Sequence, residues 1–301
     1  MVISMDIINE IKKLKVGKVL SNIDLKKYTT YKLNEKALGV VYPKDIESLV
    51  NLLSFLEKND IKYKIIGNGS NLIFTKYYNG ILIKLDEFNN LEINDNIITV
   101  GAGYSLVKLA YKAATLGLSG LEFASGIPGT VGGAVFMNAG AYKSDMGYVV
   151  QSIRVLTPDL HIINMKNEEL DFHYRTSFLM KNSGYICLEA TIKLEKKDKN
   201  EILEIIEDRK NRRIESQPLE YPSAGSVFRN PEGDFAGRLV ESIGYKGKSI
   251  NGAKVSEKHA NFIINTGNAT GNDIINLITE IKDKVKKEYG ITLKLEQEIV
   301  E

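Results

Sequence analysis

The sequence predicts a mixed α and β fold, because helical and strand-like patterns alternate along its 301 residues. In one segment, apolar residues fall at 46, 49, 50, 53 and 56, the spacing of a helix with one buried face. Short β-like runs at 63–66 and 72–74 lie on either side of a glycine-rich turn. The composition is 43% hydrophobic and 26% charged, close to that of ordinary globular proteins, so a folded core is expected.

Local signals predict the elements of the first half. Residues 1–20 are expected to form a helical N-terminal extension. Pro43 precedes the helix at 46–56, and Asp45 is a suitable N-cap for it. The other predicted elements are a helix at 106–113 and strands at 63–66, 72–74, 81–85 and 97–100.

The same alternation continues in the second half. A polar run at 195–200 is the best candidate for a domain boundary, and a helix begins near Ile202. The last helix places its apolar residues between 274 and 285 on one face and stops at Gly290. Apolar alternation then predicts a closing strand at 291–295. Strands are also predicted at 152–156 and 185–194.

Charge and composition exclude several classes of function. The formal charge is only +2, so no broad positive field for nucleic acid is present. The single cysteine, Cys187, cannot form an internal disulfide, and it lies in an apolar run typical of a buried strand. With only three histidines besides it, no structural zinc site is expected. The sequence has no signal-peptide pattern and no run of about 18 apolar residues, so we expect a cytoplasmic protein without membrane insertion.

Two glycine loops are candidate ligand sites. The loop at 67–71 can present backbone N–H groups to an anion, or it can be an ordinary hairpin turn. The loop at 125–133 has more glycines, and its alternative interpretation is a tightly packed turn. Neither loop is a known nucleotide fingerprint. The segments that come nearest to one lie elsewhere and fail: after Gly101 and Gly103, Leu106 replaces the third glycine of the dinucleotide motif, and before Gly247, Ser242 replaces the first glycine of a phosphate loop. Any bound nucleotide therefore needs another architecture.

With further motifs, these loops resemble the UDP-N-acetylenolpyruvoylglucosamine reductase family, flavoenzymes of bacterial peptidoglycan precursor synthesis. The match runs in order from Tyr28 to the C-terminus, and the combination of motifs is far more specific than either loop. The matching segments are Thr-Thr-Tyr-Lys at 29–32, Gly-Asn-Gly-Ser-Asn at 67–71, Gly-Leu-Glu-Phe at 120–123, Gly-Ile-Pro-Gly-Thr-Val-Gly-Gly at 126–133, Asn-Ala-Gly-Ala-Tyr at 138–142, Tyr-Arg-Thr-Ser at 174–177, Ser-Ala-Gly-Ser-Val-Phe-Arg-Asn-Pro at 223–231 and Val-Ser-Glu-Lys-His-Ala-Asn-Phe at 255–262.

The resemblance implies an α+β architecture: an FAD-binding fold of the vanillyl-alcohol-oxidase type, in two subdomains, followed by a C-terminal α+β substrate domain. The expected domains are the extension at 1–20, the FAD-binding domain at 21–196 with its subdomains split near 85, and the substrate-binding domain at 197–301. Only Thr176 to Gly184 separate the Tyr-Arg motif from the next predicted strand. The chain therefore resembles the shorter subgroup of the family, which lacks an extra substrate-closing loop.

The resemblance also implies a reaction in two halves. NADPH reduces FAD, and the flavin then passes hydride to the enolpyruvyl group of UDP-N-acetylenolpyruvoylglucosamine, giving UDP-N-acetylmuramate. A monomer is expected. Two alternatives stay open: a flavin oxidase on the same fold that is reoxidised by oxygen, and a flavin-free protein that binds UDP-sugars. Arg175 and Ser226 argue against the oxidase, and the intact glycine loops argue against the binding protein.

Three catalytic positions are implied by the resemblance. Arg175 would face the substrate carboxylate and stabilise the enolate-like intermediate, and Ser226 would donate the proton. From the residues alone, Arg175 could be part of a surface ion pair and Ser226 an ordinary loop serine. The third position is a C-terminal glutamate: counting from Gly290 without a gap selects Glu296, whereas the family's sequence pattern favours Glu298. On a strand both glutamates would point to the same side.

The remaining predicted site residues bind the cofactor or the substrate, and no metal ligands are predicted. By resemblance, FAD would lie against the glycine loops and the substrate against residues around the Tyr-Arg motif and the Ser226 loop. The cofactor-binding set is Gly67, Asn68, Gly69, Ser70, Asn71, Ser125, Gly126, Ile127, Pro128, Gly129, Thr130, Gly132, Gly133, Asn138 and Gly140. The substrate-binding set is Tyr174, Arg229, Asn230 and His259, the last of which could instead be a hydrogen-bonded loop histidine.

Overall fold

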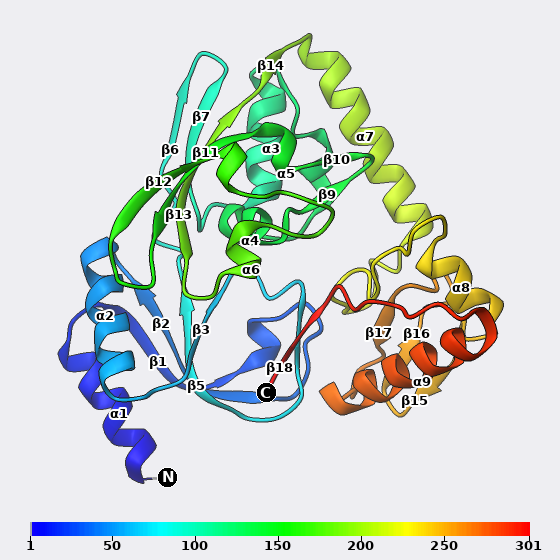
Figure 1. Ribbon diagram of the computed structural model, residues 1–301, viewed down its shortest axis with the longest axis horizontal. Coiled ribbons are helices and arrows are strands. Elements are labelled where there is room, and N and C mark those ends of the chain that lie inside the picture. Colours follow the sequence, from blue (N-terminus) through cyan, green and yellow to red (C-terminus); the bar gives the residue numbers. More distant parts are fainter. Residues whose placement is uncertain (1) are drawn as a thin grey trace. The chain divides into compact units, whose positions relative to one another are not determined.

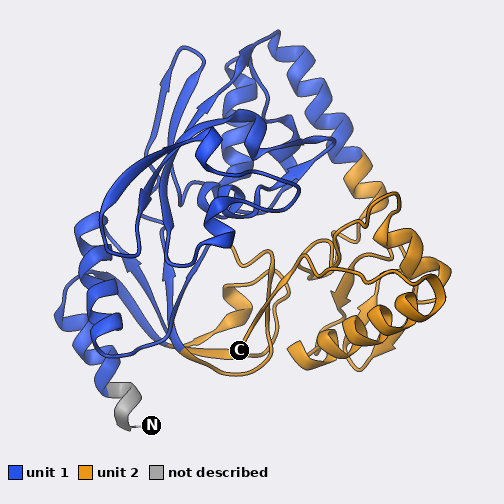
Figure 2. Cartoon of the chain, in the orientation of Figure 1, with its two compact units in different colours: residues 1–21, 39–67, 80–211 blue, residues 22–38, 68–79, 212–301 orange. Residues whose placement is uncertain are grey.

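The computed structural model describes residues 2–301, with side chains from residue 6 onward. Backbone packing divides the chain into two compact units, which are coloured separately in Figure 2. Each unit is assembled from segments that are far apart in the sequence. Unit 1 comprises the residues up to 21 together with 39–67 and 80–211, and unit 2 comprises 22–38, 68–79 and 212–301.

The N-terminal segment contains a helix and then a strand. Helix α1 (Val2–Lys13) buries Ile8 and Ile11, and β1 (Gly17–Asp24) follows it. Of the extension expected at residues 1–20, Met1 lies outside the described residues. A turn of 3-10 helix, η1 (Leu25–Lys27), comes next and is capped by the carboxylate of Asp24, which accepts a hydrogen bond from Lys26 N at 3.0 Å.

Four strands form one sheet in the order β1, β2 (Lys36–Pro43), β5 (Tyr78–Lys84) and β3 (Tyr63–Ile66). Strands β3 and β5 are parallel, with Ile66 opposite Lys84. The helix between β2 and β3 is α2 (Ile46–Lys58), which begins where the Asp45 carboxylate accepts a hydrogen bond from Ser48 N at 2.8 Å. The predicted helix at 46–56 and strand at 63–66 are thus confirmed.

The larger sheet of unit 1 has five antiparallel strands (Figure 1). Cys187 on β13 (Ile186–Lys193) is buried as predicted, and burial raises the pKa of its thiol to about 12, so the thiol stays protonated and unreactive at neutral pH. The strand order is β12 (Ile162–Lys166), β11 (Val150–Leu156), β13 (Ile186–Lys193), β7 (Ile97–Gly101) and β6 (Leu91–Asn94).

Short elements around this sheet carry the second glycine loop. Helix α3 (Leu106–Thr115) confirms the predicted helix at 106–113, and α4 (Val131–Met137) packs against β13 and β7. Helix α4 begins at the N-cap Thr130 and ends at Asn138, whose φ of 43° is left-handed. The other elements here are β8 (Leu118–Ser119), η2 (Glu122–Gly126), β9 (Gly140–Ala141), β10 (Ser144–Asp145), α5 (Met146–Val149), η3 (Asn167–Glu169), α6 (Phe178–Lys181), β14 (Glu195–Lys196) and α7 (Lys199–Ser216).

Unit 2 has its own apolar core. Helix α9 (Gly271–Tyr289) buries the apolar face predicted between 274 and 285 and packs against β15, β16 and α8. Ala224, Val227 and Phe228 are buried in the same core, which therefore fixes the loop that contains Ser226. The strands are β15 (Ser249–Ile250), β16 (Ala253–Val255) and β17 (Ile263–Asn265), and α8 spans Ala236–Ser242.

The closing strand lies further along the chain than predicted. Residues 291–295 form no strand in the described structure, apart from an isolated bridge between Leu295 and Phe228. Strand β18 (Glu298–Val300) instead pairs in parallel with β4 (Leu72–Phe74). The prediction at 291–295 was wrong, because the alternating apolar residues pack on the core of unit 2 while only the residues after 297 find a strand partner.

Candidate active site

The loop at 67–71 connects β3 to β4 and has no space for side chains at its glycines. A Cβ on Gly67 would lie 2.6 Å from Thr130 Oγ1, and a Cβ on Gly69, whose φ is 61°, would lie 2.1 Å from Tyr28 O. Lys84 Nζ donates a hydrogen bond to the Gly67 carbonyl at 2.8 Å. Within the described structure, no hydrogen bond uses the backbone N–H groups of residues 68–70. Consecutive N–H groups of this kind form a binding site for an anion.

The loop at 125–133 packs closely on the segment that leads into α3. Gly132 N donates to Ala102 O at 2.8 Å, and a Cβ on Gly132 would lie 2.8 Å from the Cβ of Ala102. Gly129 O accepts from Leu106 N at 3.0 Å, and Ser125 Oγ donates to Glu122 O at 2.9 Å. Tight packing explains the glycine at 132 by itself. It also holds the loop in one conformation, as a cofactor site requires.

The Asn-Ala-Gly motif after α4 contacts the Tyr-Arg motif rather than open space. Asn138 is buried, its Nδ2 donates to His173 O at 2.9 Å, and its Oδ1 accepts from Gly147 N at 2.9 Å. Gly140 O accepts a hydrogen bond from Arg175 Nη2 at 2.8 Å. These two residues of the predicted cofactor-binding set therefore contact the predicted catalytic arginine itself and the nearby His173.

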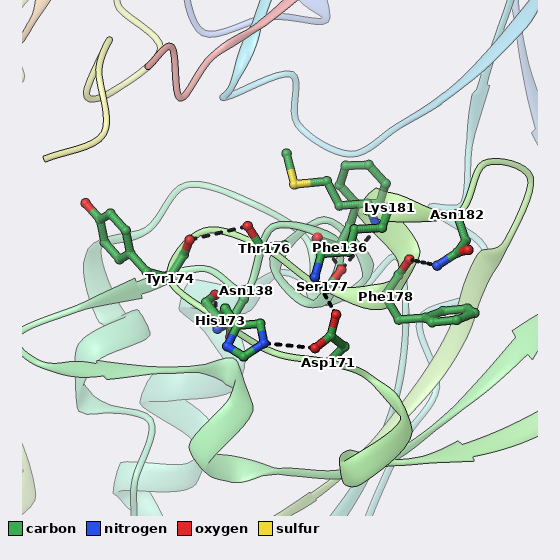
Figure 3. A network of polar contacts seen from close by, with 11 residues as sticks. Phe136, Asn138, Asp171, His173, Tyr174, Thr176, Ser177, Phe178, Lys181 and Asn182 are labelled. Atoms are coloured by element: carbon green, nitrogen blue, oxygen red, sulfur yellow. Dashed lines mark hydrogen bonds and ion pairs between the residues drawn. The ribbon is translucent and has the colours of Figure 1, made fainter. Parts of the chain in front are cut away.

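Arg175 lies in a tight turn between His173 and Thr176. The two flanking residues exchange backbone hydrogen bonds of 3.0 Å, which leaves Tyr174 and Arg175 at the tip (Figure 3 labels Tyr174 and Thr176). The guanidinium carbon of Arg175 lies 5.1 Å from the centre of the Tyr174 ring. Burial raises the pKa of the nearby Asp145 carboxyl, while hydrogen bonds and the charge of Arg175 oppose that shift.

Ser226 lies in a loop of unit 2 that is held from both sides. On one side, Asn261 Oδ1 accepts from Phe228 N at 2.9 Å and Asn261 Nδ2 donates to Phe228 O at 2.8 Å. On the other, Gln297 Nε2 donates to Gly225 O at 3.2 Å, and Gly225 has a left-handed φ of 73°. No hydrogen bond of the Ser226 hydroxyl occurs in the described structure, so the hydroxyl is available to a ligand.

The two candidate glutamates occupy different environments within unit 2. Glu296 N donates to Val227 O at 2.8 Å, directly beside Ser226, and Glu296 is half-buried. Glu298 is exposed and opens β18, where its charge adds to burial in raising the pKa of Tyr78 to about 12. The expectation that both point to one side of a strand was wrong, because Glu296 precedes the strand and the chain bends at the buried Gln297.

The predicted substrate residues of unit 2 lie around the same loop. Arg229 N donates to Lys294 O at 2.9 Å, and Asn230 Oδ1 accepts from Ala236 N at 3.0 Å at the start of α8. His259 is half-buried and its Nδ1 accepts from Asn261 N at 3.2 Å, so Nε2 is the ring nitrogen left to face a ligand. Burial lowers the pKa of His259, which keeps the ring neutral at pH 7.

Sequence reasoning missed several residues that position these loops. Asn261 and Gln297 hold the Ser226 loop, and Lys84 holds the first residue of the 67–71 loop. A lysine inside the apolar run at 81–85 was an available signal for Lys84. Asn261 belongs to a motif that was recognised but given no role, and Gln297, an uncharged residue between two glutamates, was given none either.

The free N–H groups at 68–70 suit the diphosphate of a nucleotide cofactor, and family comparisons identify the chain as a flavoprotein oxidoreductase. An FAD-binding domain model matches residues 37–166, and the model "UDP-N-acetylenolpyruvoylglucosamine reductase, C-terminal domain" matches 217–300. The chain belongs to the UDP-N-acetylenolpyruvoylglucosamine reductase family. This result confirms the predicted family, the α+β FAD-binding fold with its C-terminal domain, and FAD as cofactor.

Individual relatives match over nearly their whole length. The UDP-N-acetylenolpyruvoylglucosamine reductases of Bacillus licheniformis and Bacillus subtilis are 46% and 44% identical over 296 residues, which is 98% of this chain and 98% of each relative. The crystal structure of the corresponding reductase from Thermus caldophilus is 34% identical, has a TM-score of 0.80, and covers 94% of this chain and 98% of its own. In the described part of the chain, no helix is long and apolar enough to cross a membrane.

Proposed function

We propose that the chain catalyses the NADPH-dependent reduction of UDP-N-acetylenolpyruvoylglucosamine to UDP-N-acetylmuramate, a step in peptidoglycan precursor synthesis. The observation that carries this proposal is the Ser226 loop: its hydroxyl has no partner among the described residues, and the neighbouring Val227 accepts a hydrogen bond from Glu296 N. A serine hydroxyl free to donate its proton suits protonation of a carbanion, which an oxidase acting on alcohols does not need.

The residues of the 67–71 loop fit an FAD diphosphate. Side chains at Gly67 and Gly69 are excluded by contacts under 3 Å, and the N–H groups of residues 68–70 are available as donors. These residues, with Ser70 and Asn71, would hold the cofactor, as the sequence predicts for them and for the 125–133 loop. Bound FAD supplies the hydride acceptor and donor that no amino-acid side chain can provide.

The chain's own side chains would then act on the substrate. The guanidinium of Arg175 would bind the enolpyruvyl carboxylate, where negative charge grows as hydride is added. Ser226 would donate a proton to the carbon next to that carboxylate. Glu296 is the better placed glutamate to assist Ser226, because its backbone is bonded to the residue after the serine. Tyr174, Arg229, Asn230 and neutral His259 would contact the rest of the substrate.

A spectroscopic titration tests this function. The purified protein should show flavin absorption bands that bleach when NADPH is added without oxygen and return when UDP-N-acetylenolpyruvoylglucosamine follows. Bands that return only with oxygen would indicate the oxidase alternative. Absent bands, even after incubation with FAD, would indicate a sugar-nucleotide-binding protein.

A monomeric state and a cytoplasmic location complete the proposal. The +2 formal charge gives no general attraction to nucleic acid, and the nucleotide-sugar substrate would be supplied from the cell interior. Size-exclusion chromatography with light scattering at several concentrations tests the monomer, for which the expected mass is 33.6 kDa.

A further inference from the structure

The turn that carries Arg175 is held in an unfavourable conformation. Arg175 has a φ of 54°, in the left-handed region where a side chain costs about 1–2 kcal/mol. Turn positions with positive φ normally take glycine or asparagine. A strained arginine persists only where its surroundings fix the turn, and such positions gather at functional sites.

Two side chains connect the ends of this turn to the end of α4. Asn138 Nδ2 donates to the carbonyl of His173 at 2.9 Å, and Ser177 Oγ donates to the carbonyl of Phe136 at 2.6 Å. Figure 3 draws the residues of both contacts as sticks. Arg175 itself donates to Gly140 O, two residues beyond Asn138. The position of the guanidinium therefore depends on the end of α4.

Asn138 is the centre of this arrangement. It is 1% exposed, has a left-handed φ of 43°, and ends α4. Besides bonding His173, its Oδ1 accepts from Gly147 N at 2.9 Å, so both polar atoms of the amide have protein partners. Asparagine combines tolerance of this backbone conformation with a donor and an acceptor on one short side chain.

We propose that Asn138 is a positioning residue for Arg175, and that it affects the reaction through the 173–176 turn rather than by binding FAD. The inference rests on the proposed role of Arg175 as the carboxylate ligand. Beside the turn, Asp171 forms exposed ion pairs with His173 and Lys181.

The test begins with Asn138→Gly, which keeps the left-handed backbone but removes the amide. We expect substrate-driven reoxidation of the reduced flavin to slow on the order of tenfold, since small displacements of a positioned group carry such costs. FAD affinity and NADPH-driven flavin reduction should stay within about twofold. Asn182→Ala is the matched control, because Asn182 Nδ2 also donates to a backbone carbonyl, Phe178 O at 2.9 Å, but not in the Arg175 turn.

A double-mutant cycle with Arg175→Lys decides whether Asn138 acts through the arginine. If it does, Asn138→Gly slows reoxidation far less in the Arg175→Lys background than in the native one. Equal fold-changes in both backgrounds would overturn the proposal, and so would a tenfold or larger loss of FAD affinity in Asn138→Gly. Asn138→Asp, which retains the acceptor for Gly147 but not the donor to His173, serves if the glycine variant does not fold.

Hydrogen exchange separates failure of this inference from failure of the proposed function. The His173 and Thr176 N–H groups are bonded across the turn, so Asn138→Gly should speed their exchange whether or not Arg175 binds the carboxylate. If Arg175→Lys leaves reoxidation unchanged, the proposed role of Arg175 fails. Unchanged exchange in Asn138→Gly would overturn the positioning of the turn by Asn138.

Discussion

Lys84 places a charged side chain in a buried position at the end of β5. Its ammonium group donates to the Gly67 carbonyl and pairs with Asp86 Oδ1 at 3.2 Å, while Thr130 Oγ1 occupies the space that a Gly67 side chain would need. A buried charge is costly unless it is bonded. Here the hydrogen bond and the ion pair offset that cost. The bond to Gly67 also fixes the first residue of the loop whose free N–H groups suit a diphosphate.

Lys84→Met should therefore weaken FAD binding by about tenfold or more, the loss expected for a hydrogen bond to a charged group. Fluorescence titration of the apoprotein with FAD measures this effect. Asp86→Asn is the control, since it keeps the bond to Gly67 and removes only a partner that is 45% exposed; its effect should be within a few-fold. Equal losses in the two variants would show that the ion pair, not the Gly67 contact, is responsible.

The proton-donor role of Ser226 predicts an effect on one half-reaction only. In Ser226→Ala, NADPH-driven flavin reduction should be nearly unchanged, whereas substrate-driven reoxidation should slow about 100-fold or more, the contribution typical of general acid catalysis. Anaerobic stopped-flow absorbance separates the two steps. Equal slowing of both steps would contradict the assignment.

The two glutamates can be distinguished in the same way. Glu296→Gln should slow reoxidation by about tenfold or more, because it removes the carboxylate of the residue whose backbone is bonded beside Ser226, and Glu298→Gln should change it little. The opposite result would support the choice made from the family's sequence pattern.

At the scale of elements, α9 shows how local signals set the limits of a helix. Thr270 Oγ1 accepts from Asp273 N at 3.2 Å, and Asp273 Oδ2 accepts from Thr270 N at 2.8 Å, a reciprocal cap. The helix ends at Gly290, whose φ of 70° is left-handed. Because the apolar face of α9 is part of the core that holds the Ser226 loop, the stability of this helix bears on the site.

Thr270→Ala should lower the free energy of unfolding by about 1 kcal/mol, the usual loss for an N-cap. Urea denaturation followed by circular dichroism measures it. Thr279→Ala is the matched control on the same helix, since Thr279 is exposed and its hydroxyl donates only to Ile275 O within the helix. Comparable destabilisation by both variants would refute the cap as the cause.

At the scale of the whole molecule, each unit is built from segments distant in sequence, so a binding site exists only in the folded chain. Ligand binding therefore stabilises the fold. FAD at about 100 times its dissociation constant should raise the free energy of unfolding by about 2.7 kcal/mol, provided that it binds only the folded protein. Thermal denaturation with and without FAD measures this effect. Riboflavin, which lacks the diphosphate, should stabilise less at the same concentration, and equal stabilisation would argue against the 67–71 loop as a diphosphate site.

The sequence by itself determined the elements with strong local patterns and the identity of the motifs. Periodicity and caps, which are local properties of the chain, predict helices α2, α3 and α9. The family assignment follows from the motifs and their order along the chain. It could not place the last strand, because alternating apolar residues at 291–295 satisfy a core as well as a sheet.

Tertiary structure decided which side chains position the site. The bonds of Lys84 to Gly67, Asn138 to His173 and Gln297 to Gly225 join residues that are 17, 35 and 72 positions apart, so no local pattern records them. The bend at Gln297 likewise separated two glutamates that the sequence left equivalent. Hydrogen bonds between distant segments depend on where the fold brings the backbone, and that is fixed only when the cores of the two units are packed.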